Sequence, residues 1–245
     1  IYSGNFEGTN TAGSVAGMNS GRIENVTGFG NTVTVTGASG NAGGIVGVNN
    51  GKSDFAASDS GASTLTGNGI YDVQNVGSVI AGGNKVVAGG LVGLNAGALG
   101  NSYSDSAVTV KPGVTLDKDT TALGGVVGVN TENGDVRYVD SLGITNGGTN
   151  SSNVGGIIGV NKGNMYSGYN ESIVSGKNNV GGIIGDNGGT VANVVNATSV
   201  TGKDKDKDNV SEYVGGLIGS NNGDVNNGRN NGTITGTKYV GGMVG

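Results

Sequence analysis

The chain carries the phrase Gly43-Gly44-Ile45-Val46-Gly47-Val48-Asn49 and returns to it throughout its length. Further full copies begin at Gly89, Gly124, Gly155, Gly181 and Gly215, a degenerate copy begins at Gly13, and a truncated copy begins at Gly241. The shortest steps between copies are of 26 residues. A period of a few tens of residues is typical of a solenoid, in which each repeat stacks on its neighbours. The repeat therefore predicts the architecture of the chain.

The phrase favours strands over helices. Gly costs about 1 kcal/mol per helix position relative to Ala, and each full copy holds three glycines within five residues. We expect an all-β fold, a parallel β-helix (β-solenoid) of about eight repeats with loop insertions. A right-handed coil is expected because parallel crossovers strongly prefer that hand. The shortest repeat is interpreted as three strands, at residues 180–184, 190–195 and 199–201.

The paired apolar residues of each phrase predict the core. Neighbouring residues of a strand point to opposite faces, so the two members of a pair are not both expected inside. We assign the first member to the core, and the second to an outer stripe that an insertion loop covers or another chain packs against. The predicted core residues are Ile45, Leu91, Val126, Ile157, Ile183, Leu217 and Met243.

The asparagine that closes each phrase predicts a corner. Asn and Gly tolerate the left-handed backbone of tight turns. Asparagines at one corner of stacked coils could hydrogen-bond to each other along the axis, or each could satisfy only its own turn. The candidate ladder consists of Asn19, Asn49, Asn95, Asn130, Asn161, Asn187 and Asn221.

Composition excludes several classes of function. The chain has no His, Cys or Trp, and its formal net charge is −5. Without His or Cys it lacks the commonest general base and all thiolate metal ligands. The acidic balance argues against nucleic acid and anionic membranes, and no apolar run approaches the roughly 20 residues of a membrane span. We predict no cofactor, no bound metal, no nucleic-acid partner and no membrane span within residues 1–245.

Two short acid–arginine pairs are the candidates for carbohydrate-active chemistry. They are Asp135 with Arg137, and Asp224 with Arg229, and we interpret both as turn decoration. Sugar-binding platforms use aromatic rings, but here Trp is absent and the eight Tyr are scattered along the sequence. The alternating segment 203–208 carries Asp at every second position, as calcium loops do, but its interleaved lysines favour a solvated loop. We therefore predict a non-catalytic chain.

The motif Val-Gly-Gly-Leu/Ile-Ile/Val-Gly-x-Asn, at residues 154–161 and 214–221, resembles the GLUG motif. That motif occurs in secreted bacterial surface proteins, including filamentous-haemagglutinin-like and autotransporter-like adhesins and regions that flank immunoglobulin-A proteases. The resemblance implies an extracellular or cell-surface location and a structural motif without catalytic residues.

We accordingly expect a single solenoid array over residues 1–245, as a fragment of a longer chain. Its expected role is a rigid structural or adhesive stalk segment of an extracellular bacterial surface protein or filament. The alternatives are a self-assembling extracellular fibre subunit and a carbohydrate-active β-helix enzyme. The expected partners are further copies of the chain, or a host protein or glycan held by the insertions, which in solenoids often form the binding face.

Overall fold

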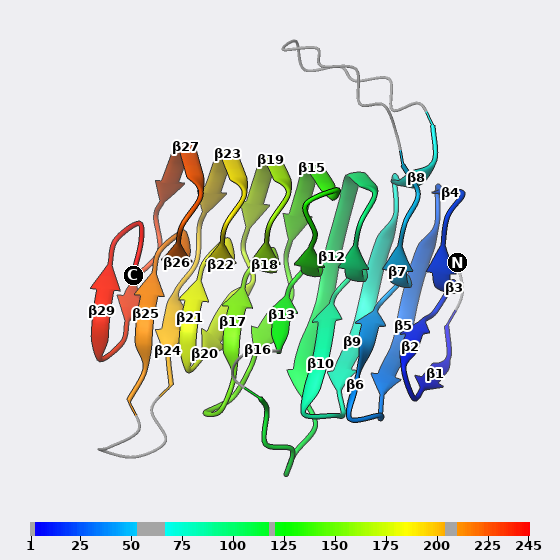
Figure 1. The fold of residues 1–245 in the computed structure, drawn as a ribbon, viewed down its shortest axis with the longest axis horizontal. Helices are drawn as coiled ribbons and strands as arrows, with labels where there is room; N and C mark the ends of the chain where they lie inside the picture. Colours follow the sequence, from blue (N-terminus) through cyan, green and yellow to red (C-terminus); the bar gives the residue numbers. More distant parts are fainter. Residues whose placement is uncertain (1–2, 53–66, 118–120, 204–209) are drawn as a thin grey trace.

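The computed structural model describes residues 3–52, 67–117, 121–203 and 210–245, and these residues contain no helix. Their strands form three sheets in which the pairings are parallel and join neighbouring coils. Figure 1 shows the coils stacked side by side along one long axis, with the two termini at opposite ends. The predicted all-β parallel solenoid is confirmed.

The strands of the three sheets alternate along the chain. The fourteen-stranded sheet contains β1 (Asn5–Gly8), β4 (Arg22–Glu24), β5 (Thr27–Val35), β8 (Gly69–Tyr71), β9 (Gln74–Ala81), β12 (Ala98–Val110), β15 (Asp135–Ser141), β16 (Ile144–Asn146), β19 (Asn164–Asn170), β20 (Ile173–Gly176), β23 (Thr190–Asn196), β24 (Val200–Gly202), β27 (Asp224–Asn230) and β28 (Ile234–Thr235). The eight-stranded sheet contains β2 (Thr11–Gly13), β6 (Ser39–Gly43), β10 (Lys85–Gly89), β13 (Ala122–Gly124), β17 (Ser152–Gly155), β21 (Asn178–Gly181), β25 (Glu212–Gly215) and β29 (Lys238–Gly241). The seven-stranded sheet contains β3 (Ala16–Asn19), β7 (Val46–Asn49), β11 (Val92–Asn95), β14 (Val127–Asn130), β18 (Ile158–Asn161), β22 (Ile184–Asn187) and β26 (Ile218–Asn221).

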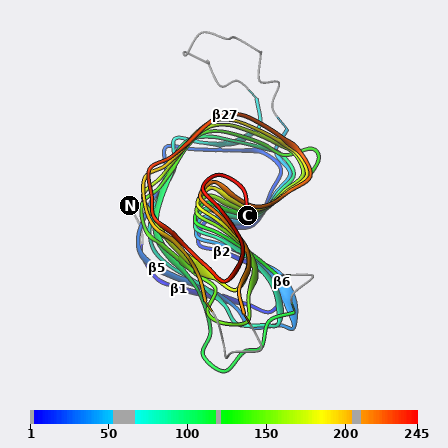
Figure 2. The ribbon, with the colours of Figure 1, turned by 90° about the vertical axis from the view of Figure 1, so that its left-hand side faces the viewer.

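The shortest coil consists of four strands, β17, β18, β19 and β20, so the predicted three strands of the shortest repeat are wrong. Among the coils that the structure describes, a coil has three strands only where β12 spans the positions of β15 and β16. The difference lies in the repeated phrase, because its second glycine and first apolar residue form a bend between two strands. Seen along the axis, the coils superpose, and the strands of the fourteen-stranded sheet run round the outside (Figure 2). The other two sheets fold back toward the middle of the profile (Figure 2).

The bend buries both apolar residues in each of the six full copies of the phrase. Ile183 lies in the bend and Ile184 begins β22, and both are fully buried in the same cluster. Strict alternation applies only within a continuous strand, so the predicted outer apolar stripe is wrong. The first members of the pairs are buried as expected at Ile45, Leu91, Val126, Ile157, Ile183 and Leu217. Met243 is an exception with 42% exposure, because no described coil lies beyond it.

The third glycine of the phrase allows the two smaller sheets to pack closely. A Cβ built on Gly185 would lie 2.5 Å from the carbonyl carbon of Asn153 and 2.6 Å from the backbone nitrogen of Val154. These two residues belong to β17, so β22 of one coil lies against β17 of the preceding coil. A side chain here would separate the sheets, and glycine is therefore required at this position.

The closing asparagines form a continuous internal column. Each side-chain Nδ2 donates to the Oδ1 of the asparagine one coil further on, at 2.8–3.0 Å, from Asn19 through Asn49, Asn95, Asn130, Asn161 and Asn187 to Asn221. From Asn49 to Asn187 the members are fully buried. The buried amides satisfy one another, which removes most of the cost of taking polar groups out of water.

A second polar column, which the sequence analysis missed, runs through the fourteen-stranded sheet. Asn170 Nδ2 donates to Asn196 Oδ1 at 2.9 Å, and Asn196 Nδ2 donates to Asn230 Oδ1 at 2.8 Å. In the preceding coils the same register position holds Ser141 and Ser104. The signal was present in the spacing, because each asparagine of this column follows a closing asparagine by nine residues.

Candidate functional site: a tyrosine-bearing face of the fourteen-stranded sheet

The outer face of β12, β15, β19 and β23 carries an unusual set of side chains because one residue per coil has a left-handed backbone. In β15 this residue is Tyr138, with φ 54°, and its equivalents are Asn101, Ser167, Asn193 and Asn227. The left-handed residue resets the alternation of the strand. Arg137 and Asp140 therefore both point outward although they are three residues apart, while Val136 and Val139 are buried.

Strand register gathers tyrosines that are far apart in sequence. Tyr103 pairs with Asp140, and Asp140 pairs with Tyr169 in the next coil. Tyr166 pairs with Arg137, next to the exposed Tyr138. The tyrosines that are scattered along the sequence therefore lie together on one face of the sheet. Tyr103 and Tyr169 each follow a closing asparagine by eight residues, but so does Tyr138, which the register does not align with them.

One of the two predicted acid–arginine pairs forms. Arg137 donates from Nε to Asp135 Oδ1 at 2.9 Å and from Nη2 to Asp135 Oδ2 at 2.8 Å. Its guanidinium also lies 5.0 Å from the ring centre of Tyr166. The hydrogen bonds to Asp135 raise the pKa of Arg137 above its ordinary value. This cation is therefore already neutralised and held against an aromatic ring.

The second predicted pair is not brought together. Arg229 donates from Nε to Asn231 Oδ1 at 2.8 Å. Among the residues that the structure describes, no ion pair joins Asp224 to Arg229. The Asp residues of segment 203–208 and the insertion at 53–63 lie outside the described residues. Within the described ranges, no group of three or more carboxylates is arranged to hold a metal ion.

A hollow of about 320 Å³ opens on the tyrosine-bearing face. It is lined by Tyr138, Asp140, Ser167, Gly168, Tyr169, Asn193 and Val195, from the neighbouring strands β15, β19 and β23. Partial burial raises the pKa of Asp140 above its ordinary value, and the nearby charge of Glu171 adds to this shift. The Tyr169 hydroxyl donates to Glu171 Oε1 at 2.9 Å, which also raises the pKa of Tyr169.

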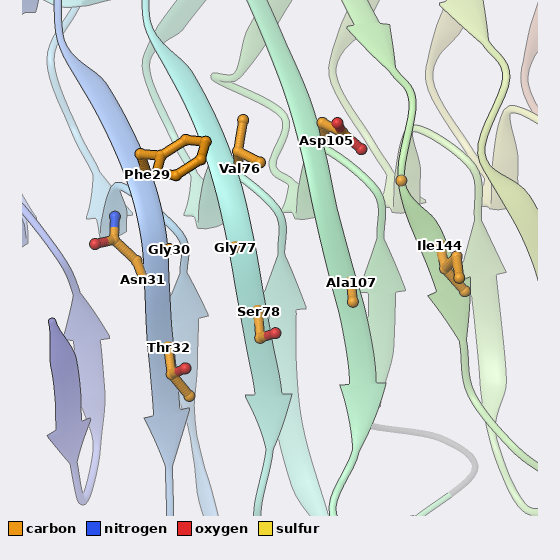
Figure 3. Close-up of a pocket in the computed structure, with 11 residues that line it drawn as sticks. Phe29, Gly30, Asn31, Thr32, Val76, Gly77, Ser78, Asp105, Ala107 and Ile144 are labelled. Carbon is orange, nitrogen blue, oxygen red and sulfur yellow. The ribbon is translucent and has the colours of Figure 1, made fainter. Parts of the chain in front are cut away.

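A separate groove of about 430 Å³ crosses β5, β9, β12 and β16 on the same sheet. Figure 3 shows its two rows of side chains, with Phe29, Val76 and Asp105 in one and Thr32, Ser78, Ala107 and Ile144 in the other. Between the rows, a Cβ on Gly77 would clash with the backbone oxygen of Asn31, so glycine there permits the close approach of β9 to β5. Asp105 is the only ionisable residue in the lining, so the groove is largely apolar.

In the part of the chain that the structure describes, no helix has the length and hydropathy of a membrane span. Comparison of the chain with models of protein families, with curated proteins and with solved structures found no match.

Proposed function

We propose that this chain is a rigid, non-catalytic structural and adhesive segment of an extracellular bacterial surface protein. The observation that carries the proposal is the unbroken stack of coils. The strands of the repeated phrase pair with those of the next coil from β7 to β26, and the asparagine column runs through the same coils.

Stiffness follows from the direction of these bonds. In a parallel β-helix the backbone hydrogen bonds run along the long axis, so bending or stretching the rod strains many of them at once. Two apolar clusters extend through successive coils. One includes Ile45, Leu91, Val126, Ile157, Ile183 and Leu217, and the other includes Val35, Ala81, Val108, Val174 and Val200. A solenoid of this kind has an extended surface along its length.

The extracellular and bacterial parts of the proposal rest on the resemblance to the GLUG motif at residues 154–161 and 214–221. The alternative of a self-assembling fibre depends on an outer apolar stripe through which neighbouring chains would pack. That stripe is absent from the described residues, since Val46, Val92, Val127, Ile158, Ile184 and Ile218 are all fully buried. We therefore favour a stalk over a laterally packed fibre.

Two measurements test the proposal. Small-angle X-ray scattering of the purified chain should fit the rigid stack of coils at every concentration, and a flexible particle or one that grows with concentration would overturn the stalk. Antibodies against residues 121–203 should label intact, unpermeabilised cells of the source organism. Labelling only after permeabilisation would overturn the surface location, even if the scattering fits the rigid stack.

A further inference from the structure

We propose that the hollow between β15, β19 and β23 binds an amine-bearing polysaccharide, a chain of 2-amino-2-deoxyhexose units with free amino groups. In this arrangement Tyr138 and Tyr169 contact the faces of the sugar rings, and the carboxylates of Asp140 and Glu171 bind the ammonium groups. This gives the adhesive role of the proposed function a ligand class and a location on the sheet face, where the sequence analysis expected binding by the insertions.

The aromatic part of the site combines exposure with a fixed position. Tyr138 is 38% exposed although it lies in the middle of a strand. In a regular strand, Tyr138 would point inward because Arg137 points outward. The left-handed backbone of Tyr138 directs its side chain outward as well. The hydroxyl of Tyr169 is held by Glu171. Tyrosine rings bind apolar sugar faces and attract cations over their π surface.

The charge of the site selects a cationic ligand. Asp140 and Glu171 lie close enough for the negative charge of one to act on the other. Among the described residues, neither carboxylate forms an ion pair with a lysine or arginine. The neighbouring Arg137 is engaged with Asp135 and Tyr166. An ammonium group bound here would relieve the repulsion between the two acids, whereas an acidic glycan would increase it.

The backbone around the hollow disfavours a basic peptide as the occupant. An extended peptide binds a sheet by adding a strand to an open edge. β15, β19 and β23 are each paired on both sides, so their backbone groups are already used. A polysaccharide uses hydroxyl groups instead, and the rim offers the hydroxyl of Ser167 and the Nδ2 donor of Asn193, whose Oδ1 accepts from Asn227. An open hollow on a long, regular face also suits a polymer that lies along it.

The experiment is isothermal titration of the whole chain with a glucosamine hexasaccharide. The fully N-acetylated hexasaccharide and hexalysine serve as comparison ligands. The test variants are Asp140→Asn and Tyr138→Asn, since asparagine occupies the equivalent left-handed positions 101, 193 and 227 and should leave the backbone intact. The matched control is Tyr213→Asn. Tyr213 is another left-handed tyrosine, but it lies in β25 and stacks on Tyr239.

The glucosamine hexasaccharide should bind saturably. Each test variant should weaken this binding about tenfold or more, because one partner of a charge or cation–π contact is lost, and Tyr213→Asn should not change it. Absence of binding, equal binding of the acetylated sugar, equal or tighter binding of hexalysine, or insensitivity to both variants would overturn the inference. The scattering profile and the cell labelling are measured independently, so the stalk can stand when the ligand assignment fails.

Discussion

Asn161 Nδ2 donates to Oδ1 of Asn187 in the next coil at 2.8 Å, and the same Nδ2 donates to the carbonyl oxygen of Gly163 in its own turn at 3.2 Å. The sequence left open whether these asparagines form a ladder or only close their own corners. The structure shows that one amide does both. Each corner is therefore coupled to the next, and the turn conformation and the register of the stack depend on the same side chain.

Substitution Asn161→Ala should destabilise the chain by about 1–3 kcal/mol. The change removes the acceptor of Asn130 Nδ2 and the donor to Asn187 Oδ1, and both of those residues are buried. The measurement is urea unfolding, in which the midpoint should fall. Asn164→Ala is the matched control, because Asn164 is an exposed asparagine at the start of the next strand. Equal losses in the two variants would show that the ladder contributes nothing specific.

Substitution Ser141→Asn should stabilise the chain by about 0.5–1.5 kcal/mol, the usual worth of a new hydrogen bond. Ser141 occupies the register position of Asn170, and its buried Oγ has no hydrogen-bond partner among the described residues. Ser141 lies against Gly125 and Asn170 lies against Gly156, which are both the second glycine of a phrase. The space around Ser141 therefore resembles the space that holds the asparagine side chain of Asn170. Thermal unfolding checks the gain, with Ser141→Ala as a near-neutral control. A lower melting temperature for Ser141→Asn would show that the column cannot be extended.

Substitution Gly185→Ala should destabilise the chain by about 1–3 kcal/mol or more through overpacking. The added methyl group would lie 2.5–2.6 Å from backbone atoms of β17 and of Gly159, which cannot move aside as a side chain could. Gly188→Ala in the same coil is the control, because its nearest contact is an oxygen 3.9 Å away. Unfolding in urea should separate the two variants clearly, and similar midpoints would contradict the close packing of β22 on β17.

Substitution Asp140→Asn should leave stability equal or higher at neutral pH. Folding raises the pKa of Asp140, so the folded chain binds a proton at this carboxyl more tightly than the unfolded chain does. Asp140 therefore adds to the free energy of unfolding at pH values below its ordinary pKa, and this stabilisation is lost as the pH rises through the raised pKa. Asparagine does not titrate, so the stability of the variant does not fall in this way at neutral pH. The melting temperature of the variant should therefore exceed that of the unsubstituted chain at neutral pH, and this difference should shrink on acidification. Glu24→Gln should show the opposite trend, since its hydrogen bond to Arg22 lowers the pKa of Glu24. A parallel pH profile for both variants would contradict the assigned shifts.

The repeated phrase predicted the parallel coil, the position of the corner asparagines and most of the core. It did not predict four strands per coil, because the bend at Gly182 and Ile183 lies inside what looks like one apolar strand. The alternation rule then assigned one residue of each pair to the outside, although the bend turns both inward.

The tyrosine-bearing face was hidden for a related reason. The turn after Asn130 is two residues longer than the turn after Asn161, so Asp140 and Tyr169 fall at different distances from their corner asparagines. Only the pairing of β15 with β19 shows that they are neighbours.

The sequence alone determined that this chain stacks, because glycines at fixed intervals permit close approach and a recurring asparagine can bond to its own copy one coil away. The tertiary structure decided which side chains reach the surface. Orientation depends on bends and left-handed residues such as Tyr138, whose backbone angles the residue types do not specify. Neighbours across coils depend on strand register, which is a property of the whole stack.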